Sequence, residues 1–163
     1  MSRNYKGIWF FGLSGSGKTF LSKILFKKIK KSVIIDGDKV RKYISSDLKY
    51  SKKDREKQIN RLFGLGKIII ESNKFPIISS VYFNKKVLSL CIKNEIYVLR
   101  IDRNEYGLMK KNNPTYNLKK NVVGIDLQYE NMNNDVLDNN EKKNFWLQNK
   151  NIINIVSKQK NTY

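Results

Sequence analysis

The chain has 163 residues, of which 40% are hydrophobic and 29% are charged, and this length fits one domain with a buried core. With one cysteine and no histidine, an intramolecular disulfide and histidine-based acid–base chemistry are excluded, and a zinc site is disfavoured. No apolar run is long enough to cross a membrane. The first residues lack the pattern of a secretory signal, so we expect a cytoplasmic protein without a membrane partner.

The 33 basic and 14 acidic residues give a net charge of +19, which has two interpretations. A basic chain suits a nucleic-acid or other polyanionic partner. The lysines are scattered, however, and the sequence has no alanine but many lysine, asparagine and isoleucine residues, a bias typical of an AT-rich genome. We therefore favour compositional drift together with a small phosphorylated ligand, and a nucleic-acid partner is the less favoured alternative.

Apolar runs alternate with segments of helical periodicity along most of the chain. The apolar runs predict buried strands at residues 8–11, 32–36, 75–81 and 95–101. The periodic segments predict helices at residues 18–31, 38–46, 52–72 and 85–93. A polar loop region follows at 102–134, and we expect a last helix at 141–149 and a last strand at 151–156. This alternation predicts an α/β fold in which helices cover both faces of a parallel sheet, as a single domain over residues 1–163.

Residues 12–19 read GLSGSGKT and match G-x-x-x-x-G-K-[ST] in full, between a predicted strand and a predicted helix. In such a loop, glycines allow successive backbone N–H groups to face phosphate oxygens. Lys18 adds a positive charge near the β- and γ-phosphates, and the Thr19 hydroxyl is the predicted Mg²⁺ ligand. The motif predicts binding of ATP with Mg²⁺ through Gly12, Ser14, Gly15, Ser16, Gly17, Lys18 and Thr19.

Two aspartates, Asp36 and Asp38, follow the second predicted strand. In an open parallel sheet, ligands bind beyond the carboxyl ends of the strands. Carboxylates at that place suit a Mg²⁺ ion or a hydroxyl nucleophile that has to be oriented for phosphoryl transfer. Asp38 also precedes a helical segment, so an N-cap is the structural alternative. We predict a functional role that helix capping accompanies.

The motifs that follow resemble the adenylylsulfate kinase family. DGDKVR at 36–41, DLKYS at 47–51 and DR at 54–55 have the spacing of that family's DGDNVR, DLGFS and DRxENIRR, and NVVGID at 121–126 resembles its NFTGID. The resemblance implies a P-loop NTPase fold with a lid at about residues 103–124. It also implies transfer of the γ-phosphate of ATP to the ribose 3′-hydroxyl of a small 5′-linked nucleotide.

The resemblance also implies roles for individual residues. Asp36 would orient or deprotonate the acceptor hydroxyl and is a second candidate metal ligand, and Lys18 would be the other catalytic residue. Acceptor-binding roles are implied for Asp38, Arg41, Tyr50, Arg55, Gln58, Val122 and Ile125. Because the family often forms dimers, a homodimer is left open.

Departures from the family pattern concern the acceptor. The family holds its acceptor adenine between two phenylalanines, and those positions are Tyr50 and Val122 here. Since base–aromatic stacking contributes about 1–3 kcal/mol per base, the loss of one ring disfavours adenine. The pattern resembles a divergent branch of the family from surface-polysaccharide gene clusters, which implies cytidine diphosphoramidate as the acceptor in capsule biosynthesis. Adenylylsulfate is the alternative acceptor, and a nucleic-acid-directed kinase is a lesser alternative.

Overall fold

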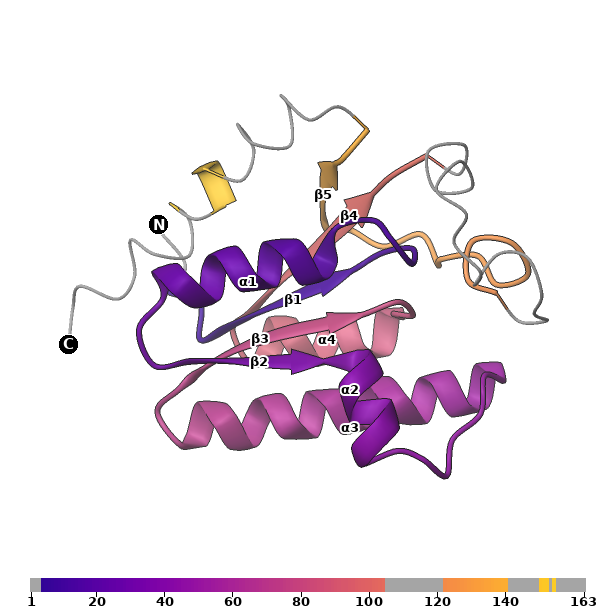
Figure 1. Cartoon of the computed structure of the whole chain (residues 1–163), viewed down its shortest axis with the longest axis horizontal. Helices are drawn as coiled ribbons and strands as arrows, with labels where there is room; N and C mark the ends of the chain where they lie inside the picture. The colour runs from indigo at the N-terminus through magenta and orange to yellow at the C-terminus, as the bar shows by residue number, and fades with distance from the viewer. Residues whose placement is uncertain (1–3, 105–121, 141–149, 153, 155–163) are drawn as a thin grey trace.

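A five-stranded parallel sheet forms the centre of the computed structural model, which describes residues 4–104, 122–140, 150–152 and 154. The strand order is β2-β3-β1-β4-β5, and every neighbouring pair is parallel (Figure 1). The strands are β1 (Gly7–Phe11), β2 (Ser32–Asp36), β3 (Phe75–Ser80), β4 (Ile96–Asp102) and β5 (Asp135–Asp138). The helices are α1 (Lys18–Lys28), α2 (Gly37–Tyr43), α3 (Lys52–Glu71) and α4 (Lys85–Lys93). Within these described ranges, no helix is both long and apolar enough to span a bilayer.

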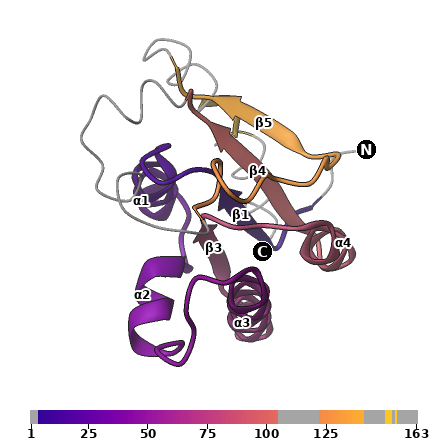
Figure 2. The same cartoon turned by 90° about the vertical axis from the view of Figure 1, so that its right-hand side faces the viewer.

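The central strand β1 is buried on both faces, and its alternating side chains divide the core in two. Ile8 and Phe10 pack with apolar residues of α1 on one face. Trp9 and Phe11 pack with residues of α3 and α4 on the other face. Figure 2 shows α1 on one side of the sheet and α3 and α4 on the opposite side. Burial on both faces explains the uninterrupted apolar run, which is typical of a strand in a parallel sheet, and the predicted α/β fold is confirmed.

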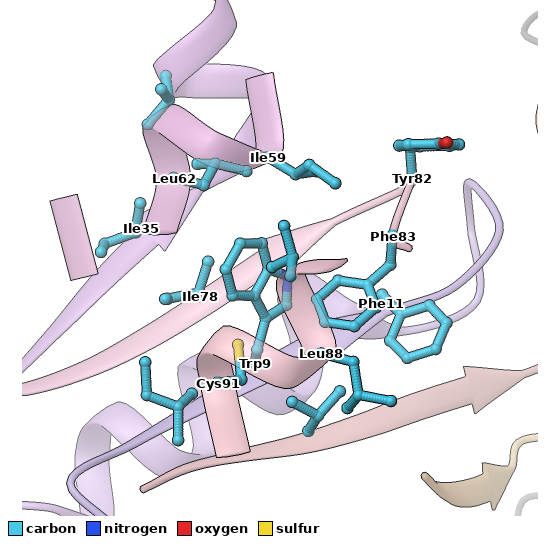
Figure 3. Packing of buried hydrophobic residues seen from close by; sticks show 14 of the residues in the cluster. Trp9, Phe11, Ile35, Ile59, Leu62, Ile78, Tyr82, Phe83, Leu88 and Cys91 are labelled. Atoms are coloured by element: carbon cyan, nitrogen blue, oxygen red, sulfur yellow. The ribbon is translucent and has the colours of Figure 1, made fainter. Parts of the chain in front are cut away.

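Aromatic rings pack together where β1 and β3 end on the α4 side (Figure 3). Phe11 stacks on Phe83 with the ring centroids 4.6 Å apart, and Trp9 meets Phe83 edge-on at 5.2 Å. The indole N–H of Trp9 donates to Ser80 Oγ at 2.9 Å, and that hydroxyl donates to the carbonyl oxygen of Tyr82 at 2.8 Å. This packing fixes the segment after β3, which borders the pocket described below.

The predicted elements differ from the observed ones mainly near the C-terminus. The sequence pattern does not predict β5, because three of its four residues are exposed and Leu137 alone is buried. The strand predicted at 151–156 is wrong where the structure describes that segment, since residues 150–152 and 154 are helical. A short apolar run fits a helix as well as a strand, which accounts for the error. The helix predicted at 141–149 and most of the predicted lid at 103–124 lie outside the described residues.

Candidate active site

A pocket of about 400 Å³ lies at the carboxyl ends of the central strands. Its walls come from the loop after β1, the starts of α1, α2 and α3, the loop between α2 and α3, and the segment after β3. Ligands of open parallel sheets bind in this position. The predicted site residues that line the pocket are Ser14, Gly15, Gly17, Lys18, Thr19, Asp36, Asp38, Arg41, Tyr50, Arg55, Gln58 and Val122. We call the part formed by residues 14–19 the phosphate end and the part formed by Arg41, Tyr50 and Arg55 the arginine end.

At the phosphate end, the loop after β1 curls tightly and brings the amino end of α1 to the pocket. Gly12 has a φ of +153°, and a Cβ atom there would lie 2.2 Å from the carbonyl oxygen of Ile101, so the position requires glycine. Gly17 caps α1 in the left-handed conformation, and the first turn of α1 has no acidic residue. The helix therefore presents its free N–H groups and the positive end of its dipole to the pocket, an arrangement that binds phosphate.

Two of the predicted phosphate-binding residues, Gly12 and Ser16, support this loop from behind and do not line the pocket. Ser16 is fully buried, and its backbone N–H donates to the carbonyl oxygen of Leu13 at 3.1 Å. Its hydroxyl oxygen has no hydrogen-bond partner within the described part of the chain. A backbone cradle and an unsatisfied hydroxyl both fit a loop built to surround an anion.

Lys18 folds back over the same loop. Its ammonium group donates to the carbonyl oxygens of Gly12 at 2.9 Å and Leu13 at 2.7 Å. Burial lowers the pKa of Lys18 to about 8, although the nearby carboxylates of Asp38 and Asp36 act to raise it. The charge is therefore held in a poorly solvated place, where an anionic ligand would stabilise it strongly.

The oxygen atoms around Lys18 also fit a hard cation. Thr19 is exposed at the start of α1, and its neighbours in the pocket include Asp36 and Asp38. Hydroxyl and carboxylate oxygens are the ligands that Mg²⁺ takes, usually together with phosphate oxygens of a substrate. Thr19 is thus placed to hold Mg²⁺, with a carboxylate nearby.

Asp36 is the N-cap of α2, and its Oδ1 accepts from the backbone N–H groups of Asp38 at 2.9 Å and Lys39 at 3.3 Å. The N-cap predicted at Asp38 is therefore wrong by two positions, because the helix begins at Gly37 and Asp38 lies in its first turn. Both capping bonds use one carboxylate oxygen. The other oxygen, Oδ2, is left for a ligand in the pocket that Asp36 lines.

Gln58 of α3 is tied to the start of α2. It is buried, and its Nε2 donates to the carbonyl oxygen of Gly37 at 3.1 Å. Its Oε1 is buried without a hydrogen-bond partner among the described residues. Gln58 lines the pocket, so this unsatisfied acceptor lies on a residue that borders the ligand space. A Cβ atom on Gly37 would lie 2.7 Å from the carbonyl oxygen of Ser79, so this junction is closely packed.

At the arginine end, two guanidinium groups lie against one tyrosine ring. The guanidinium carbon of Arg41 is 4.9 Å from the centroid of the Tyr50 ring, and that of Arg55 is 5.5 Å from it. Arg41 donates to the carbonyl oxygen of Lys49 at 2.8 Å, and Arg55 Nε donates to the carbonyl oxygen of Tyr50 at 3.2 Å. Burial, followed by repulsion from Arg41, lowers the pKa of Arg55. Two cations that disfavour each other in this way are suited to share an anionic ligand.

The turn at 122–127 packs on the phosphate-binding loop. Val122 is buried and lines the pocket, and its backbone N–H donates to a carboxylate oxygen of Asp126 at 2.9 Å. Gly124 has a φ of +93°, and a Cβ atom there would lie 2.6 Å from the Leu13 side chain. Ile125 is 45% exposed and does not line the pocket, so the structure does not bring its side chain to the other predicted site residues.

The motifs did not assign a role to several residues that the structure brings to the site. Phe20, Ser79 and Tyr82 line the pocket, and Arg103 donates from the end of β4 to the carbonyl oxygen of Gly15 at 3.1 Å. Phe20 follows directly on the GKT sequence, so its place was open to prediction. Tyr82 reaches the pocket, and Arg103 reaches the phosphate-binding loop, through the order of the strands, which no local pattern reveals.

The fold and the phosphate end define a P-loop NTPase of the α/β class. The family model described as adenylylsulphate kinase matches residues 5–138, which is most of the chain. The chain therefore belongs to the adenylylsulphate kinase family.

Similar sequences and solved structures support this family assignment. An adenylyl-sulfate kinase of Buchnera aphidicola is 39% identical over 85 residues, which cover 48% of this chain and 41% of the relative. A protein of Sorangium cellulosum described as a "Probable bifunctional SAT/APS kinase 2" is 33% identical over 138 residues, which cover 76% of this chain and 23% of the relative. This chain thus spans less than half the length of these relatives. An APS kinase of Mycobacterium tuberculosis, solved in complex with AMPPNP and APS, has the same fold, with a TM-score of 0.80 and 19% identity over 94% of this chain and 98% of that chain.

Proposed function

We propose that this protein is an ATP-dependent kinase that phosphorylates the ribose 3′-hydroxyl of a 5′-linked nucleotide. The observation that carries the proposal is a single pocket that joins a phosphate-binding loop to a second end with two arginines around an aromatic ring. A kinase of two nucleotides needs both ends in one cavity, because in-line transfer requires the acceptor oxygen beside the γ-phosphorus. Membership of the adenylylsulphate kinase family supports the same reaction class.

In this proposal the phosphate end binds the donor. The N–H groups at the start of α1 and the Lys18 ammonium group hold the β- and γ-phosphates and stabilise the negative charge of the transition state. Thr19 would hold Mg²⁺, with Asp36 as a second ligand, and the ion would neutralise phosphate charge when bound. Ser14, Gly15 and Gly17 supply backbone to the same cradle.

Asp36 orients the acceptor hydroxyl. With Oδ1 fixed by two backbone N–H groups, the carboxylate cannot rotate freely, and Oδ2 is the oxygen left to accept from the hydroxyl of an acceptor in the pocket that Asp36 lines. The hydroxyl oxygen forms a bond to the γ-phosphorus, the bond from that phosphorus to the β,γ-bridging oxygen breaks, and ADP leaves. The hydroxyl proton passes to Asp36.

For the acceptor, we propose cytidine diphosphoramidate, which would place the enzyme in the synthesis of capsule phosphoramidate. The support is that Val122, which lines the pocket, stands where the family has a second stacking ring, and the loss of that ring disfavours adenine. Adenylylsulfate is the second candidate, and it is favoured by the curated relatives, which are described as adenylyl-sulfate kinases. Tyr50, Arg55 and Gln58 would contact either nucleotide.

The test is release of ADP by the purified protein with Mg-ATP and each acceptor in turn, with phosphorus NMR of the product. A new 3′-phosphomonoester on either nucleotide supports the kinase, and the acceptor with the higher kcat/KM identifies the substrate. Asp36→Asn is the matched control, since it should abolish the acceptor-dependent release. Equal ADP release with and without both acceptors would overturn the proposal.

A further inference from the structure

Tyr82 lies outside the motifs of the phosphate-binding loop and of the two aspartates, yet it lines the pocket. Tyr82 follows β3 and is 7% exposed. Figure 3 shows its ring set apart from the stacked rings of Phe11 and Phe83. Tyr82 belongs to the same buried cluster as Phe11 and Phe83, but, unlike those two residues, it also lines the pocket.

The backbone around Tyr82 is anchored by two side chains. The carbonyl oxygen of Tyr82 accepts from Ser80 Oγ at 2.8 Å, and the carbonyl oxygen of Val81 accepts from the Tyr129 hydroxyl at 2.7 Å. Burial, together with the carboxylates of Glu56 and Glu130, raises the pKa of Tyr82.

The residues that follow Tyr82 are fixed as well. Asn84 Oδ1 accepts from the backbone N–H of Val87 at 3.0 Å, and Glu130 accepts from the backbone N–H of Lys85 at 2.8 Å. The backbone that carries the Tyr82 ring is therefore held in place before any ligand arrives. A preorganised wall of this kind loses little side-chain entropy on binding.

Tyr82 lines the same pocket as the three residues of the arginine end, Arg41, Tyr50 and Arg55. Tyr50 comes from the loop between α2 and α3, whereas Tyr82 comes from the segment between β3 and α4. Two aromatic side chains from different elements thus line one cavity.

We propose that Tyr82 is a specificity-determining residue of the acceptor subsite, where its buried ring packs against the planar base of the acceptor nucleotide. This inference rests on the proposed function and deepens it. The ring of Tyr50 contacts Arg41 and Arg55. Because Tyr50 is also 47% exposed, its side chain can adapt to the ligand. Tyr82 is anchored and buried, and it therefore sets the space that the base can occupy.

The test is acceptor binding by calorimetry in the presence of ADP and Mg²⁺, with cytidine diphosphoramidate and adenylylsulfate as the two probes. Tyr82→Leu removes the ring and should weaken binding of the preferred acceptor roughly 5- to 100-fold, with ADP affinity unchanged. Tyr82→Phe keeps the ring and should stay within about threefold of the wild type. Tyr43→Leu is the matched control, because Tyr43 is 72% exposed on α2 and does not line the pocket.

The outcomes separate this inference from the proposed function. If the wild-type protein binds and phosphorylates an acceptor and Tyr82→Leu binds it equally well, the role of Tyr82 is overturned while the kinase stands. If the wild-type protein binds neither probe, the proposed function fails and the inference fails with it. Should Tyr82→Leu not fold, Tyr82→Trp supplies the same test, since a larger ring should weaken adenylylsulfate binding more than binding of the cytidine compound. An unchanged ratio of the two affinities would then overturn the inference.

Discussion

Arg61 of α3 and Asp47 of the loop between α2 and α3 form a two-bond ion pair, with Nη1 to Oδ1 at 2.6 Å and Nη2 to Oδ2 at 2.8 Å. The hydrogen bond lowers the pKa of Asp47 and raises the pKa of Arg61. Both groups are exposed, so the pair contributes little to global stability. Its geometry nevertheless fixes the loop that carries Tyr50, three residues further along the chain.

Asp47→Asn should therefore weaken acceptor binding without changing ATP binding. Loss of one charge loosens the loop, and Tyr50 then has to be ordered when the acceptor binds, which we expect to raise the acceptor KM about threefold. Steady-state kinetics with each substrate varied in turn measure the effect. Glu71→Gln is the matched control, because it removes the exposed Lys67–Glu71 pair at the far end of the same helix. A rise in KM for ATP of the same size would show that the loop does not act on the acceptor alone.

Asp36→Asn should reduce kcat by roughly 10²–10⁴ while the melting temperature stays near that of the wild type. Asparagine caps helices about as well as aspartate, so the bonds to the N–H groups of Asp38 and Lys39 survive. The substitution removes only the charge and the ability to accept a proton. Asp36→Ala removes the cap as well, and it should cost about 1 kcal/mol of stability in addition to the loss of kcat. A normal kcat for Asp36→Asn would restrict Asp36 to its structural role.

The phosphate end could be predicted almost completely from sequence, because its geometry depends on local backbone conformation. The positive φ values at Gly12 and Gly17 and the helix that follows are consequences of one short motif. The buried strands were predictable for a similar reason, since burial on both faces of a parallel sheet requires continuous apolar runs.

The rest of the site depends on contacts between distant segments, which local patterns do not encode. The family resemblance implied an acceptor-binding role for Arg41, and the structure shows that its guanidinium group donates to the carbonyl oxygen of Lys49. Tyr82 reaches the pocket because β3 lies between β1 and β2 in the sheet. The strand β5 has a single buried residue, Leu137, so its sequence carries almost no pattern to predict.

Gly64→Ala should stabilise the protein. Gly64 lies inside α3, and a Cβ atom there would meet no heavy atom within 4 Å. Alanine in a helix interior is favoured over glycine by about 1 kcal/mol, so the free energy of unfolding in denaturant should rise by about that amount. Gly37→Ala is the informative contrast, because its Cβ would lie 2.7 Å from the carbonyl oxygen of Ser79 and should destabilise the protein. Equal effects of both substitutions would contradict the packing described here.

The last prediction concerns pH and Lys18. Since burial lowers its pKa to about 8, the ammonium group is charged below that pH and loses its proton as the pH rises through it. ATP binding should restore the proton, because the phosphates stabilise the charged form.

The Kd for ATP should therefore increase between about pH 8 and 9.5, by up to tenfold per pH unit, with uptake of one proton. Calorimetry in buffers of different ionisation enthalpy measures that uptake directly. In the same range this group makes the unfolded state bind more protons than the folded state, so its contribution to the free energy of unfolding rises with pH. The chain has no histidine, and burial raises the pKa of Cys91 to about 12. Neither histidine nor cysteine therefore contributes proton uptake in this pH range. Lys18→Arg stays charged throughout, and a Kd that still rises with pH in that variant would assign the effect to another group.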